Sequence, residues 1–180
     1  IFKVYVAGLY VPAKSSDPAA LLAQKGPRRM ALTMLRNVDA DSFAGAMNDG
    51  LKSNHTEAQL AAFKAQIDAL NAALKAVGEA KKGDLVLIEY MPDTGTRITV
   101  NGQPKGASIP GEDFYAAVLR IWLGDKPVDA DLKKGLLGGK IKWNFEKFVI
   151  TPSGDVHRFL PNTEPDDPAI VSVIESALPA

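Results

Sequence analysis

The sequence predicts an α+β protein, and three patterns support that prediction. Asn101-Gly102 follows a short run of strand-forming residues, and this pair favours a type I′ hairpin turn because both positions must take positive φ. Apolar residues between positions 56 and 77 recur every third or fourth residue, which is the period of an α-helix. Residues 29–35 alternate instead with the period of a β-strand.

The first part of the chain is expected to contribute two strands and a short helix. Residues 2–11 are rich in β-branched and aromatic side chains, and Pro12 ends this strand. Asp17 can cap the free N–H groups of a short helix, and Pro18 suits its first position because no N–H is needed there. Residues 29–35 are largely apolar on both faces, so we expect a central strand that is covered on both sides.

The next predicted element is an amphipathic helix. It begins near Asp39 or Asp41, and either residue can serve as its N-cap. Its apolar positions recur every fourth residue, at Phe43, Met47 and Leu51. One face of this helix is therefore expected to be buried.

A longer helix is expected over residues 56–77. Thr56 and Gln59 fit a capping box at its start, and Gly78 ends it. The apolar stripe along this helix can pair with another helix in a coiled coil or pack on a sheet. Because the stripe is short and lies within a compact domain, packing on the sheet is the preferred interpretation.

The second half of the chain repeats the alternation of strands and helices. Strands are expected at residues 84–91, 97–100 and 103–108, a helix from residue 112 to Gly124, a shorter helix from Asp129 to Leu137, strands within 141–150 and 155–161, and a helix over 168–178.

The composition limits the classes of function. Hydrophobic residues make up 46% and charged residues 23% of the chain, as in ordinary globular proteins. Lys plus Arg equals Asp plus Glu at 21 each, so no basic excess is available for nucleic acid. Cysteine is absent, the two histidines are far apart, and no apolar run is long enough to cross a bilayer. We therefore expect no nucleic-acid partner, no membrane span, no metal site and no cofactor.

Three long segments resemble the bacterial chalcone-isomerase-like family: residues 2–12, 83–106 and 109–138. The resemblance implies an open-faced β-sandwich, in which a curved antiparallel sheet has helices packed on one side. It also implies a domain over residues 1–139 that lacks the N-terminal strands of its relatives. Bacterial members usually carry a signal peptide, so the resemblance implies a periplasmic or secreted protein.

The residues that the enzymes of this family share are replaced here. Those enzymes carry a Thr on the first matched strand, and this position falls at Tyr5. Ser42 or Phe43 stands where their helical Tyr would be, and Asn48 is out of register with their Asn. Their Arg position lies before residue 1. Losing these donors would remove stabilisation of the developing oxyanion, so we expect no catalytic residue.

The resemblance therefore predicts a non-catalytic binder of a fatty acid or another small apolar ligand. The ligand would lie between the sheet and the helix that carries Phe43 and Met47, with Tyr5 as its polar handle. The predicted ligand-binding residues are Tyr5, Thr33, Met34, Phe43 and Met47. One alternative is an intramolecular lyase that acts on a chalcone-like unsaturated ketone, with Tyr5 or an upstream Arg as donor. A second alternative is a protein-interaction module that uses the helix over 56–77 or a sheet edge.

The tail differs from the rest of the chain. Residues 140–161 resemble the C-terminal hairpin of glutathione peroxidases, in which Trp and Asn, here Trp143 and Asn144, flank a reactive Cys or selenocysteine. Without a Cys, peroxidase activity is not expected. Residues 140–180 are near the lower size limit at which a chain without a disulfide or metal stabilises its own core, so we expect a hairpin and helix packed on the first domain. A natural fusion, an engineered chimera and a composite sequence all remain open.

Overall fold

The computed structural model divides the chain into two compact units, Ile1–Lys140 and Ile141–Ala180. It describes residues 4–138, 147–150, 156–159 and 167–177. Each unit is described by itself below.

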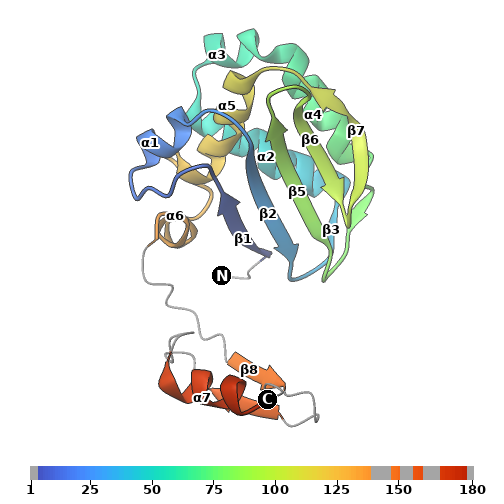
Figure 1. Ribbon diagram of the computed structural model, residues 1–180. Coiled ribbons are helices and arrows are strands. Elements are labelled where there is room, and N and C mark those ends of the chain that lie inside the picture. Colours follow the sequence, from blue (N-terminus) through green and yellow to red (C-terminus); the bar gives the residue numbers. More distant parts are fainter. Residues whose placement is uncertain (1–3, 139–146, 151–155, 160–166, 178–180) are drawn as a thin grey trace. The chain divides into compact units, whose positions relative to one another are not determined.

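The first unit is built on a five-stranded sheet in which every neighbouring pair is antiparallel (Figure 1). Its strand order is β1-β2-β5-β6-β7. The strands are β1 (Tyr5–Tyr10), β2 (Arg28–Met34), β5 (Leu85–Met91), β6 (Gly95–Val100) and β7 (Gln103–Ile109). Two short strands that the sequence did not predict, β3 (Val38–Asp39) and β4 (Glu79–Ala80), pair with each other.

The hairpin between β6 and β7 has the predicted turn. Asn101 has a φ of 50° and Gly102 a φ of 80°, so both central positions are left-handed. Asn is one of the few residues other than glycine that tolerates this conformation. The two strands then pair with a register shift between Thr96 and Ile98.

Six helices accompany this sheet among the residues that the structure describes. They are α1 (Pro18–Ala23), α2 (Ala40–Asn54), α3 (Glu57–Ala62), α4 (Lys64–Lys75), α5 (Glu112–Leu123) and α6 (Ala130–Leu136). Their predicted caps are confirmed: the side chains of Asp17, Asp39 and Asp129 each accept a backbone N–H, and Thr56 and Gln59 form the capping box.

The helices lie on one face of the sheet, and the core fills the space between (Figure 1). Met30, Leu32 and Met34 of β2 point into this core, while Arg29 and Thr33 are exposed on the other face. The expectation that this strand is covered on both faces was therefore wrong. The predicted fold class is confirmed, an α+β arrangement with helices on one side of an antiparallel sheet.

The long helix expected over residues 56–77 is interrupted at Phe63, which lies between α3 and α4 with a φ of −96° and a ψ of 12°. Hydrogen bonding continues across the interruption, because Phe63 N–H donates to Gln59 and Ile67 N–H donates to Phe63. The ring of Phe63 packs edge-on to Phe114, with 5.6 Å between ring centroids. The apolar stripe of this region packs against the core, so the preferred interpretation is confirmed over a free coiled-coil face.

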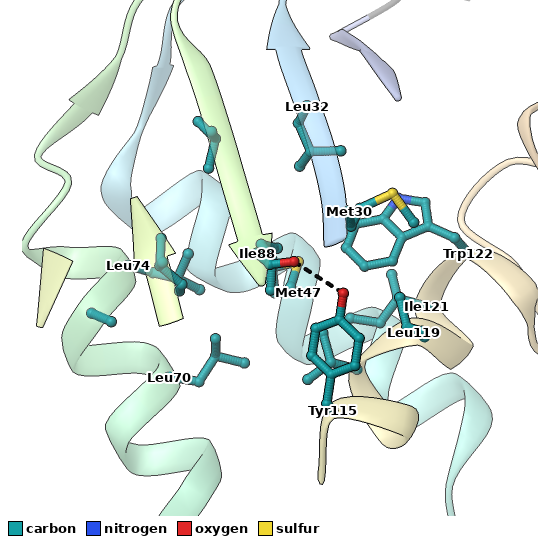
Figure 2. Close-up of a cluster of buried hydrophobic side chains, with 14 of the residues drawn as sticks. Met30, Leu32, Met47, Leu70, Leu74, Ile88, Tyr115, Leu119, Ile121 and Trp122 are labelled. Atoms are coloured by element: carbon teal, nitrogen blue, oxygen red, sulfur yellow. Dashed lines mark hydrogen bonds between the residues drawn. The ribbon is translucent and has the colours of Figure 1, made fainter. Parts of the chain in front are cut away.

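Helix α5 is the most buried helix of the unit and packs against α2, α1 and α6. It lies close to α2 at Gly50. A methyl group on Gly50 would lie 2.7 Å from Cγ2 of Ile121, a separation that real Cβ atoms do not reach. Figure 2 shows Ile121 in the cluster that also holds Met30, Met47, Tyr115 and Trp122. The position therefore requires a residue without a side chain.

The second unit contains β8 (Lys147–Ile150), β9 (Val156–Phe159) and α7 (Pro168–Ala177), and its two strands pair antiparallel. Asp167 begins the helix by accepting the N–H of Ala169. The remaining parts of the two predicted tail strands lie outside the described residues. The predicted packing of residues 140–180 on the first domain stays a prediction. No helix among the described residues is both long and apolar enough to cross a membrane.

Candidate functional site

Tyr5 lies at the first position of β1, directly opposite Met34 of β2. Its hydroxyl oxygen accepts a hydrogen bond of 2.9 Å from Nε1 of Trp122, near the C-terminal end of α5. Trp122 is 1% exposed, whereas Tyr5 is only partly buried. The pair therefore links the sheet to α5 at a point where the core approaches the surface.

Four of the five predicted ligand-binding residues lie on the helix side of the sheet. Met34, Phe43 and Met47 are buried in the core, and Tyr5 packs against the same core. Thr33 does not join them, because neighbouring residues of a strand point to opposite faces. It is exposed on the open face, so the five residues do not form one site.

The surroundings of Tyr5 keep its hydroxyl protonated. Burial raises the pKa of this phenol, the hydrogen bond from Trp122 opposes that rise, and the nearby charge of Asp129 adds to it. The phenol is thus neutral at physiological pH. Its oxygen already accepts one hydrogen bond, and its own proton remains available for an acceptor.

Trp122 was not recognised as a site residue from the sequence, where it appeared only on the apolar face of a helix. A buried tryptophan needs an acceptor for its indole N–H, which was the available signal. The identity of that acceptor, Tyr5, depends on bringing together residues 117 positions apart.

A second, charged group fixes the opposite end of α5. Arg28 of β2 has a fully buried side chain, and its Nη2 lies 2.8 Å from Oε1 of Glu112. Its Nε donates to the carbonyl of Gly26 at 3.2 Å. The guanidinium carbon lies 5.3 Å from the ring centroid of Tyr90 and 5.2 Å from that of Tyr115. Two aromatic rings and one carboxylate thus surround this cation.

The partners of Arg28 have perturbed acidities. Partial burial acts to raise the pKa of Glu112, but hydrogen bonds from Gly26 and Lys25, with the charges of Lys25 and Arg28, hold it below its usual value. Burial raises the pKa of Tyr115 well above its usual value, against the opposing charge of Arg28. The Tyr115 hydroxyl donates to the carbonyl of Ile88 at 3.0 Å, the dashed line in Figure 2.

The sequence also left Arg28 unassigned, because the predicted strand began at the next residue. The missed signal was its register in the strand, two residues before Met30. Counting back by two from Met34, Leu32 and Met30 puts Arg28 on the buried face. The arginine is held so completely by protein groups that we interpret it as structural. Of the three guanidinium nitrogens, Nη1 is the one that is buried and without a hydrogen-bond partner in the described residues, and the guanidinium lies against two aromatic rings.

The two ends of α5 therefore offer different chemistry. At the C-terminal end, Tyr5 and Trp122 bring a hydroxyl and an indole N–H together at the edge of the apolar core, and the charge of Asp129 lies near enough to act on Tyr5. This end therefore combines an apolar surface with one hydroxyl whose proton is free for a further hydrogen bond. The described residues contain no cluster of three His, Asp or Glu side chains that could hold a metal ion.

Comparison with known proteins gives one match over a short segment and one over most of the chain. A glutathione peroxidase from Lactococcus lactis subsp. cremoris (strain MG1363) is 57% identical over 35 residues, which are 19% of this chain and 22% of that protein. The chain thus spans less than a quarter of that relative. The profile described as chalcone isomerase-like matches residues 1–138, including β1 to β7 and α1 to α6. The chain belongs to the chalcone isomerase-like family.

Proposed function

We propose that the protein is a non-catalytic member of its family that binds a fatty acid or another small apolar molecule at the Tyr5–Trp122 end of the core. The observation that carries the proposal is the hydrogen bond between these two side chains, 2.9 Å long. It pairs two neutral polar groups with each other at the edge of the apolar core. Catalysis of ring closure needs donors aimed at a developing oxyanion, and Tyr5 offers a single neutral hydroxyl.

The lining favours an adaptable site. Met30, Met34 and Met47 all belong to the core on the helix side of the sheet. Unbranched thioether side chains change rotamer at low cost and fit irregular ligands. Ligand entry would require Trp122 to move, because this end of the core is closely packed. A ligand that binds the opened state better than the packed state shifts the population toward it.

Displacement of dansyl-undecanoic acid, a fluorescent fatty acid, from the full delipidated chain tests the proposal. Palmitate is expected to compete, and extraction of the freshly purified protein is expected to release bound lipid. Trp122→Ala should strengthen probe binding, because it removes the largest side chain beside Tyr5 and leaves a cavity.

Phe114→Ala is the matched control. Phe114 is as deeply buried as Trp122 but lies at the other end of α5, beside Phe63. It should lose similar stability without a gain in probe affinity. Absence of any bound or competing lipid, or an equal gain in both variants, would contradict the proposed site.

The isomerase alternative has one supporting observation, the proton of Tyr5. The Tyr5 hydroxyl accepts from Trp122, so its own proton can be donated to a ketone oxygen. Absorbance of a chalcone, followed with and without the protein, tests this function. The non-catalytic proposal predicts the buffer rate for the native chain and for Tyr5→Phe alike. A faster native rate that Tyr5→Phe abolishes would favour the enzyme instead.

We also propose that the protein acts in the periplasm or outside the cell, as the family resemblance implies. Fractionation of cells that produce the natural full-length gene product is expected to recover it outside the cytoplasm. Recovery with cytoplasmic marker proteins would refute this location.

A further inference from the structure

The open face of the sheet carries a groove that the proposed ligand site does not include. Its volume is about 370 Å³, and it lies at the edge where β1 and β5 end and β2 begins, on the side away from the helices. Its lining includes Tyr10, Pro12, Pro27, Arg29, Glu89 and Met91. Small-molecule pockets in proteins begin at about 300 Å³, so the groove is large enough for a small organic ligand.

Apolar side chains form the walls of the groove. Tyr10 is 60% exposed and Met91 is 44% exposed, although each presents a large apolar surface. Single exposed apolar residues are common and need no explanation. Here, however, the two belong to one hollow together with two prolines. The aromatic ring and the thioether both interact well with another aromatic ring.

A row of charged side chains crosses the floor of the groove and continues to Arg97, which lies next to Glu89 outside the lining. Tyr10, Arg29, Glu89 and Arg97 form one row across four strands. Nη2 of Arg29 lies 2.6 Å from Oε1 of Glu89, while Nη2 of Arg97 lies 3.9 Å from Oε2. Two guanidinium groups therefore share one carboxylate. Both are nearly half exposed, at 46% and 45% of their side chains, so donors remain available to an added anion.

We propose that this groove binds a small aromatic carboxylate. The acid group would take the unused donors of Arg29, and the ring would lie between Tyr10 and Met91. Arg29 already lies over the Tyr10 ring, with its guanidinium carbon 5.8 Å from the centroid, so the cation and the apolar wall are adjacent. The site is on the opposite face from the Tyr5–Trp122 end and is independent of the proposed function.

The probe pair 3-phenylpropionate and 3-phenylpropanamide separates charge recognition from apolar contact, because the two differ only in the acid group. Binding is measured on the full chain by NMR chemical-shift titration. The acid is expected to bind at least about fivefold more tightly than the amide and to shift the amide signals of Tyr10, Arg29 and Met91. Equal affinities, or shifts located elsewhere, would overturn the proposal.

Substitutions of the two charged residues in the groove are expected to change the affinity for the acid in opposite directions. Arg29→Gln should weaken binding of the acid about fivefold and leave the neutral amide unchanged. Glu89→Gln should strengthen binding of the acid, because it frees the guanidinium groups from their shared carboxylate. Lys64→Gln removes one exposed positive charge from α4 and should change neither affinity. If Glu89→Gln weakens the acid, or Lys64→Gln has the effect of Arg29→Gln, the groove is not the site.

Discussion

The two ends of α5 are joined to the same sheet by different kinds of interaction. At its N-terminal end, Glu112 holds the buried Arg28 in a charged group that also includes Tyr90 and Tyr115. At its C-terminal end, Trp122 donates one neutral hydrogen bond to Tyr5. A buried charge tolerates little movement, because losing its partner is costly. A neutral pair beside unbranched thioether side chains separates more easily, which is why the proposed ligand site is at this end.

Substitution of Arg28 is expected to have the largest effect on stability, and it tests whether the charged end of α5 is held more strongly than the neutral end. Arg28→Met should lower the free energy of unfolding by about 3–5 kcal/mol, because Glu112 loses its buried partner and the rings lose their cation. Urea unfolding followed by circular dichroism measures the change. Adding Glu112→Gln should recover part of the loss. A loss below about 1 kcal/mol would mean that the charged group does not hold α5 to the sheet more strongly than the neutral pair does.

Substitution of Tyr5 tests the neutral end. Tyr5→Phe leaves the N–H of Trp122 without its acceptor, and it should cost about 1–2 kcal/mol in the same urea assay. Fluorescence of the indole reports the local change, with a Trp143→Phe background removing the second tryptophan signal. A cost equal to that of Arg28→Met would remove the contrast between the two ends.

The hydroxyl of Tyr115 offers a comparison within the charged end. Tyr115→Phe keeps the ring beside Arg28 but removes the hydrogen bond to the carbonyl of Ile88. The expected loss is about 1 kcal/mol, the usual net value of one hydrogen bond. Thermal unfolding measures it. A loss as large as that of Arg28→Met would indicate that the hydroxyl, and not the cation, secures this end.

The pH dependence of stability gives the smallest and most selective test. The pKa of Glu112 is lowered in the folded chain, so its stabilisation is present above the unfolded pKa of about 4.3 and is lost as the pH falls through the folded value. Glu112→Gln should therefore flatten the acid side of the stability profile. Tyr5→Phe should leave that side unchanged. If the stability of Glu112→Gln fell more steeply at acidic pH than that of the native chain, the stabilising role of the Glu112 carboxylate would be contradicted.

The alkaline side should behave differently, because tyrosines are buried at both ends. The pKa values of Tyr5 and Tyr115 are raised, so their stabilisation is full below the unfolded value of about 10 and is lost as the pH rises through the folded values. Either Tyr→Phe substitution should reduce this loss. Equal alkaline profiles in the native chain and both variants would show that neither phenol is linked to folding.

Local sequence determined most of the secondary structure of the first unit. Helix caps at Asp17, Thr56 and Asp129, and the turn at Asn101-Gly102, depend on residues within four positions of each other, so they can be predicted without the fold. The interruption at Phe63 was not predictable from the same patterns. At this position the ring of Phe63 packs against Phe114, which is distant in the sequence.

The tertiary structure alone decided which of the predicted ligand-binding residues lie on the same face of the sheet. Alternation along β2 required Met34 and Thr33 to point apart, but only the position of the helices showed which of them is buried. The partners Trp122 for Tyr5 and Glu112 for Arg28 lie 117 and 84 positions away. Sequence patterns report local geometry, whereas hydrogen bonds and ion pairs across the core depend on the packing of α5 on the sheet, and this packing involves the whole domain at once.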